Sequence, residues 1–171
     1  MGLLQDFLNT ADIESETDLV ATPASLREWL ARRGLVPRAA ELGAAEHARV
    51  LELRERLRDA LEAITHGTSP RAAFTQLNSI AARVPLRVRF DDAAHLEPAR
   101  RDAPALGPIL AAVYDALGDE ALVRLKVCRN DACRWAFYDT SRNRSGVWCT
   151  MAICGNRQKG RVYRRRHTAD Q

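Results

Sequence analysis

The feature that most constrains this 171-residue chain is the spacing of its four cysteines, which all lie near the C-terminus. They form two C-x4-C pairs, Cys128 with Cys133 and Cys149 with Cys154, and 15 residues separate the pairs. Cysteine pairs on tight turns bring two sulfurs to one ion, and four thiolates suit tetrahedral zinc. Four such ligands leave no open position for a water nucleophile, so the spacing predicts one structural zinc ion per chain. Two disulfides, or four buried free thiols, are the alternatives.

The compartment expected for the chain favours a metal over disulfides. The N-terminal segment "MGLLQDFLNTADIESETD" is acidic and lacks the basic start of a signal peptide. No apolar run approaches the ~20 residues that cross a bilayer. We therefore expect a cytoplasmic protein with no membrane partner. The cytoplasm is reducing, and clustered cysteines in it indicate metal binding.

Charge is divided unevenly along the chain. Residues 128–171 hold ten Lys and Arg against three Asp, a net charge of +7, whereas the residues before them carry a net charge of −3. An acidic body joined to a basic end is typical of a protein whose end binds a polyanion.

Hydrophobic periodicity predicts a mainly α-helical body. Helical patterns cover 24–34, 39–67, 69–81 and 102–117, and period-two alternation at 85–90 predicts a strand, with 95–100 as its hairpin partner at a sheet edge. A second alternating stretch, 121–128, leads to the first cysteine. We expect a helical N-terminal domain, 1–122, with a small β-hairpin. A small four-cysteine zinc-finger module with a basic terminal helix follows at 123–171.

The stretch "CRNDACRWAFYDTSRNRSGVWCTMAICGNRQK" resembles the zinc finger named for its Cys-Gly-Asn-Arg signature, the CGNR finger. The matching positions are Phe137 to Asp139, Ser141 to Arg144, Trp148 and Cys149, Met151, and Cys154 to Arg157. "DFLNT" and "LREWL" are similar to the ABATE-like domain that precedes this finger. The resemblance implies a bacterial, stress-linked transcription regulator with a helical N-terminal domain. One departure is Gly146-Val147, where basic residues are common in the family, so one or two phosphate contacts are expected to be missing.

Two basic segments are the candidate nucleic-acid contacts, with duplex DNA favoured. They are Arg142, Asn143 and Arg144 in a polar loop, and Arg157, Lys159, Arg161, Arg164, Arg165 and Arg166 in the terminal helix. A solvated basic tail is the alternative for the helix. The rings of Trp135, Phe137 and Trp148 are expected to form a small core around the zinc. An RNA-binding module would instead expose Trp135, Tyr138 and Trp148 to stack on unpaired bases. A third hypothesis is a protein–protein adaptor, in which zinc only holds the basic surface together.

The signature near the N-terminus leaves two interpretations open. Phe7, Asn9 and Thr10 can cap a helix end, or they can line a pocket for a small-molecule effector, which would make the body a sensor. The amphipathic helices can also form a homodimer and so present two fingers to two half-sites. No catalytic motif is present, and we expect that the protein is not an enzyme.

Overall fold

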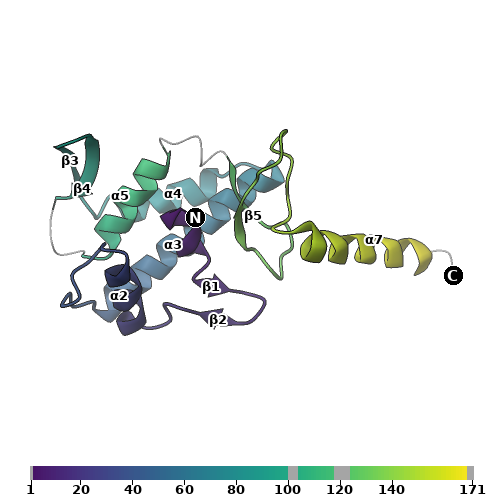
Figure 1. Ribbon diagram of the computed structural model, residues 1–171, viewed down its shortest axis with the longest axis horizontal. Coiled ribbons are helices and arrows are strands. Elements are labelled where there is room, and N and C mark those ends of the chain that lie inside the picture. The colour runs from purple at the N-terminus through teal and green to yellow at the C-terminus, as the bar shows by residue number, and fades with distance from the viewer. Residues whose placement is uncertain (1, 100–103, 118–123, 169–171) are drawn as a thin grey trace.

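The computed structural model describes residues 2–99, 104–117 and 124–168. A cluster of helices forms the body, a finger packs against one end of it, and the terminal helix projects away from both (Figure 1). The helices are α1 (Leu3–Leu8), α2 (Pro23–Arg32), α3 (Ala44–His66), α4 (Arg71–Ala81), α5 (Leu106–Leu117), the π-helical turn η1 (Met151–Gly155) and α7 (Asn156–Thr168). The strands are β1 (Ala11–Asp12), β2 (Thr17–Asp18), β3 (Leu86–Phe90), β4 (Ala94–Pro98), β5 (Leu125–Val127) and β6 (Ala136–Tyr138). The mainly α fold with short antiparallel strand pairs is confirmed.

Local signals explain where the two best-defined helices begin and end. Thr22 and Ser25 form a reciprocal capping box at the start of α2. The central helix α3 ends at Gly67, whose φ of 71° is the left-handed conformation that glycine adopts most easily. Helix α3 lies at the centre of the body, where α1, α2, α4 and α5 all pack against it.

The strands form three separate antiparallel pairs, β1 with β2, β3 with β4, and β5 with β6. The predicted hairpin is confirmed, with Leu86 opposite Pro98 and Phe90 opposite Ala94. Its alternating apolar residues do not form a buried face, because Val88 is 56% and Phe90 78% exposed. The hairpin packs on α5 through β4, and its turn end extends beyond the body (Figure 1).

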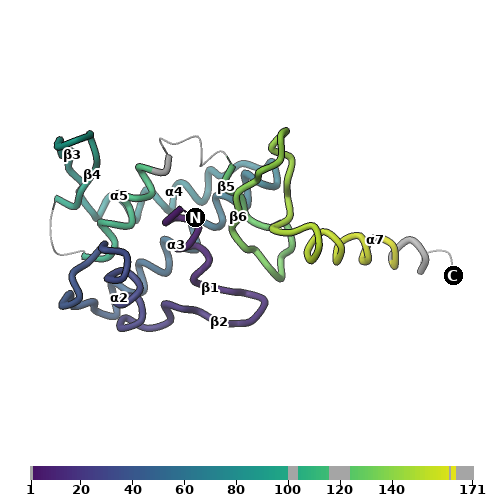
Figure 2. The backbone as a smooth tube through the Cα atoms, viewed as in Figure 1, coloured from purple at the N-terminus to yellow at the C-terminus, as the bar shows by residue number. Residues whose placement is uncertain are grey.

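The finger shares the main hydrophobic core of the body. Leu125, Val127 and Ala136, from β5 and β6, are almost fully buried in the cluster that contains the apolar faces of α1, α2 and α3. The trace in Figure 2 shows both strands lying against the helical body. Burial of these apolar side chains in the core of the body therefore anchors the finger.

Two expectations lie outside the described residues. These are the domain boundary at 122/123 and the first part of the strand expected at 121–128. No helix in the described ranges has the length and apolar character needed to span a membrane.

Candidate metal centre

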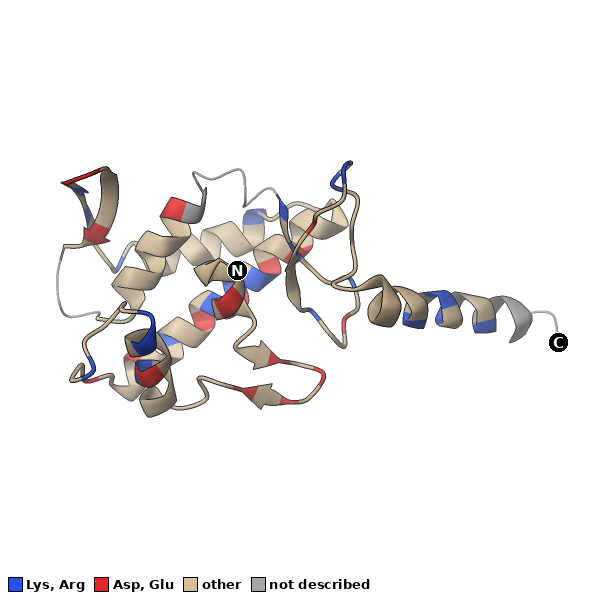
Figure 3. Ribbon diagram, in the orientation of Figure 1, with Lys and Arg blue, Asp and Glu red and all other residues tan. Residues whose placement is uncertain are grey.

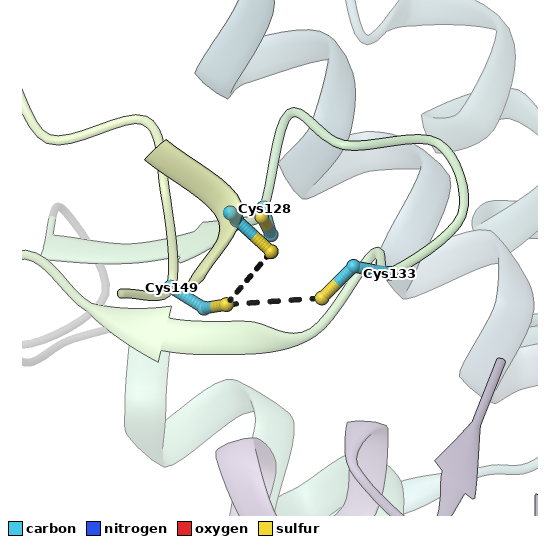
Figure 4. Close-up of side chains that lie close together, drawn as sticks. Cys128, Cys133 and Cys149 are labelled. Carbon is cyan, nitrogen blue, oxygen red and sulfur yellow. Dashed lines mark hydrogen bonds between the residues drawn. The ribbon is translucent and has the colours of Figure 1, made fainter. Parts of the chain in front are cut away.

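The four cysteine sulfurs converge on one point, although two loops of the chain supply them. All four Sγ atoms lie within 4.8 Å of one another. The Sγ of Cys149 is 3.7 Å from the Sγ of Cys133 (Figure 4). It is also 3.7 Å from the Sγ of Cys154. A tetrahedron with zinc–sulfur bonds of about 2.3 Å has edges of about 3.8 Å, which matches these separations. A disulfide needs about 2.05 Å, and all four cysteines are free. The centre fits one zinc ion held by Cys128, Cys133, Cys149 and Cys154, in a structural role.

Each cysteine pair sits on a tight turn that backbone hydrogen bonds close. Cys128 follows β5, and its N–H donates to the carbonyl of Trp135 at 2.9 Å. The N–H of Cys133 donates to the carbonyl of Asn130 at 2.7 Å. In the second turn, the Thr150 hydroxyl caps η1, which carries Cys154.

The pKa values of the thiols show why the centre needs a cation. A hydrogen bond from Cys133 lowers the pKa of Cys128 to about 5. The same bond and burial raise the pKa of Cys133, while burial and the neighbouring Cys128 charge raise that of Cys149 to about 12. Four adjacent thiolates repel one another, so they cannot all ionise alone. A divalent cation removes that penalty and holds every sulfur in its charged form.

Side chains around the sulfurs complete the site. The rings of Trp135, Phe137 and Trp148 pack against the cysteine cluster, as the sequence predicts. The amide of Asn130 donates to the Sγ of Cys154 at 3.7 Å. The N–H of Gly155, just past the last cysteine, donates to the carbonyl of Thr150 at 3.1 Å.

An internal ion pair holds the loop 139–146 that follows β6. Lys126 Nζ donates to Asp139 Oδ2 at 2.7 Å and to the Gly146 carbonyl at 2.9 Å. The same carboxylate accepts the N–H groups of Ser141 and Gly146 at 2.9 and 2.8 Å. Burial alone would raise the pKa of Asp139, but these hydrogen bonds outweigh it and hold the pKa well below its usual range. Residue 146 must be glycine here, since a Cβ would lie 2.7 Å from Asp139 Oδ1.

The basic residues singled out from the sequence occupy two separate places. The loop exposes Arg142, Asn143 and Arg144. Helix α7 carries the other basic candidates and projects away from the finger and its loop (Figure 3). Arg157 Nη1 pairs with Glu14 Oε1 at 2.7 Å, so one basic group is already bound by the body. Lys159, Arg161 and Arg164 are exposed, and the side chains of Arg165 and Arg166 lie outside the described part.

Near the N-terminus, Asn9 binds the finger. Its Oδ1 accepts the N–H of Ala136 at 2.8 Å, and its Nδ2 donates to the Ala136 carbonyl at 2.9 Å. Asn9 is the C-cap residue of α1, as the helix-end interpretation expects, while its side chain pairs with the finger. Thr10 does cap the end of α1, since its hydroxyl donates to the carbonyl of Phe7 at 2.8 Å, and the Phe7 ring is buried in the core.

Other contacts between body and finger come from residues that the sequence reasoning missed. Arg134 donates to Asp59 at 2.8 Å and to Glu62 at 2.7 Å, and the Thr65 hydroxyl accepts the N–H of Val127 at 3.2 Å. Three of these residues lie on one polar face of α3. Charged residues on a helix are usually solvated, so periodicity carried no signal for this role.

Comparison with known families agrees with this geometry. Residues 2–120 match the family model ABATE, described as "Putative stress-induced transcription regulator", and residues 124–167 match the CGNR zinc finger. No curated protein matches the chain. Both models describe regulator or zinc-binding domains rather than enzymes. The chain therefore belongs to the ABATE family and ends in a CGNR zinc finger whose four cysteines can hold one zinc ion.

Proposed function

We propose that the protein is a zinc-dependent transcription regulator that binds duplex DNA through its finger and terminal helix, while the body senses a ligand or dimerises. The loop 139–146 is the observation that carries this proposal. Lys126 and Asp139 fix its backbone from the inside, while Arg142 and Arg144 remain exposed on the outside. Two guanidinium groups on a rigid loop are suited to bidentate contacts with phosphate or guanine, because little side-chain and backbone freedom is lost on binding.

Helix α7 supports the same function. Its 13 residues span about 20 Å and include no acidic residue. Arg157, Arg161 and Arg164 follow at spacings of four and three, which puts them on one helix face. On this face, Arg157 pairs with Glu14 and Arg161 Nη1 donates to Asn130 Oδ1 at 3.5 Å, whereas Lys159 is exposed elsewhere on the helix. The major groove of DNA is about 12 Å wide and admits an α-helix.

The aromatic side chains favour duplex DNA over single-stranded RNA. Trp135 and Trp148 are half-buried against the cysteine cluster, and Tyr138 is half-buried against the main core, so packing already uses part of each ring. Base stacking requires open ring faces.

The ion pairs of the finger support nucleic-acid binding over the adaptor hypothesis. Glu14 pairs with Arg157, but Arg142, Arg144 and Lys159 make no ion pair with any acidic residue that the structure describes. These three basic groups are thus left for an external polyanion.

Binding to duplex DNA at increasing salt tests the proposal. Four to six phosphate contacts predict a slope of roughly −4 to −5 for log K against log salt, at about −0.9 per phosphate. Replacing Arg164, Arg165 and Arg166 with Ala should flatten the slope by about two to three and leave the zinc content unchanged. The matched control replaces three exposed arginines of the body, Arg27, Arg71 and Arg83, and should leave the slope nearly unchanged.

Loop variants separate base contacts from phosphate contacts. If the loop touches bases, Arg142→Ala or Arg144→Ala costs about 1–3 kcal/mol on preferred sequences and little on random DNA. A slope near zero, or triple variants that bind as well as the parent, would refute DNA binding. Tighter binding to single-stranded RNA than to duplex would favour the RNA hypothesis.

A further inference from the structure

An apolar cavity of about 620 Å³ lies in the helical body. Helices α3, α4 and α5, the β3–β4 hairpin and Leu4 of α1 form its walls. Its floor consists of Leu53, Leu57 and Leu61, which are buried core residues of α3. Its rim includes Ile64 and Phe74, which are 50% and 46% exposed. The cavity is therefore a groove that is open to solvent at its rim, not an enclosed void of the core.

The chemistry of the lining defines what can bind. Among the residues that the structure describes, the lining includes no Lys, Arg, His, Asp or Glu, and its polar side-chain groups are the Asn78 amide and the Tyr114 hydroxyl. An ionised ligand would lose its hydration here without gaining a partner of opposite charge. The volume falls within the roughly 300–1,000 Å³ of small-molecule sites.

We propose that this cavity binds a neutral, predominantly apolar small molecule. Its depth favours a small molecule over a second copy of the chain, because the floor reaches buried residues of the central helix. The sequence reasoning considered a pocket at Phe7, Asn9 and Thr10, but none of these three residues lines the cavity, to which α1 contributes Leu4.

Two elements connect the cavity to the finger. Helix α3 lines the cavity with Leu61 and holds the finger with Glu62 and Thr65. Helix α1 lines it with Leu4 and holds the finger with Gln5, whose amide donates to the Ala136 carbonyl at 3.2 Å. An occupant that shifts either helix also shifts a partner of β5 or β6. The inference that the cavity is the sensing site of a regulator rests on the proposed function. The inference that the cavity binds a small molecule does not.

The binding test uses N-phenyl-1-naphthylamine, a neutral apolar probe that fluoresces on leaving water, with the zinc-loaded full chain and no DNA. We expect saturable binding of one probe per chain. Ala81 lines the cavity and is exposed, so Ala81→Trp fills the space without entering the core. This variant should weaken binding at least tenfold. Ala72→Trp, at an exposed position of α4 outside the lining, is the matched control and should bind within twofold of the parent. Ala81→Leu provides a smaller filling variant if circular dichroism shows that Ala81→Trp is misfolded.

Three results would overturn the assignment. The first is an absence of saturable probe fluorescence. The second is equal probe affinity in the parent and in both filling variants. The third is a dimer in sedimentation that Ala81→Trp dissociates, together with probe binding to the monomer alone. The third result would make a second copy the occupant.

A second measurement compares duplex affinity with and without saturating probe. A change of fivefold or more supports sensing, and an unchanged affinity refutes sensing while leaving the binding site intact. Failure of the parent to bind DNA would refute the proposed function without affecting the probe titration.

Discussion

Asn9→Ala tests how the body holds the finger. Ala136 is fully buried, and its N–H donates to Asn9 Oδ1 at 2.8 Å. Its carbonyl accepts from Asn9 and also from Gln5, so in the variant the carbonyl keeps one donor. The N–H loses its acceptor, which costs about 1–3 kcal/mol, and loss of the second hydrogen bond adds about 0.5–1.5 kcal/mol. The expected loss in the free energy of unfolding is therefore about 1.5–4.5 kcal/mol.

Urea unfolding of the zinc-loaded protein, followed by tryptophan fluorescence, measures this loss. For a chain of this size the same change lowers Tm by roughly 3–18 °C. Asn143→Ala removes the same side chain from an exposed loop position and should change stability by less than about 0.5 kcal/mol. Zinc content should be unchanged, since Asn9 is not a ligand. If Asn9→Ala unfolds at the same urea concentration as Asn143→Ala, the hydrogen bonds do not contribute as argued.

Three further predictions follow from the structure. Native mass spectrometry should find one zinc per chain, and thiol titration should detect four reactive cysteines only after a chelator is added. Freshly purified protein with two disulfides and no metal would contradict the assignment of a zinc centre. Lys126→Met leaves the buried carboxylate of Asp139 without its cation and should cost about 3–5 kcal/mol in urea unfolding, whereas the exposed Lys159→Met should cost little. Burial raises the pKa of Asp18, but the hydrogen bonds from Arg54 outweigh burial, so the pKa is lowered. The ionised carboxylate therefore stabilises the fold at pH values above its unfolded pKa of about 3.9, and this stabilisation is lost as the pH falls below that value. The stability difference between parent and Asp18→Asn should be constant from pH 7 to about pH 5 and should narrow below about pH 4; a difference that does not vary over this range would refute the assignment.

Much of the fold could be predicted from the sequence, because its signals are local. The capping box at Thr22, the periodic apolar residues of α3 and Gly67 at its end predicted helices that the structure contains. The paired cysteines and the CGNR motif predicted the zinc centre, because ligand spacing on tight turns is also a property of nearby residues.

Only the tertiary structure decided what those elements do to one another. Asn9 and Ala136 are 127 residues apart, and nothing near Asn9 in the sequence indicates that its amide pairs with a finger strand. The polar face of α3 looked solvated, yet it holds Arg134 and the backbone of β5. The cavity likewise depends on how α3, α4 and α5 are spaced, since each helix presents the same apolar pattern whether its neighbour packs closely or leaves room for a ligand. Local backbone preferences and ligand spacing act over a few residues, whereas hydrogen bonding and packing between distant segments depend on relative positions that exist only once the chain has folded.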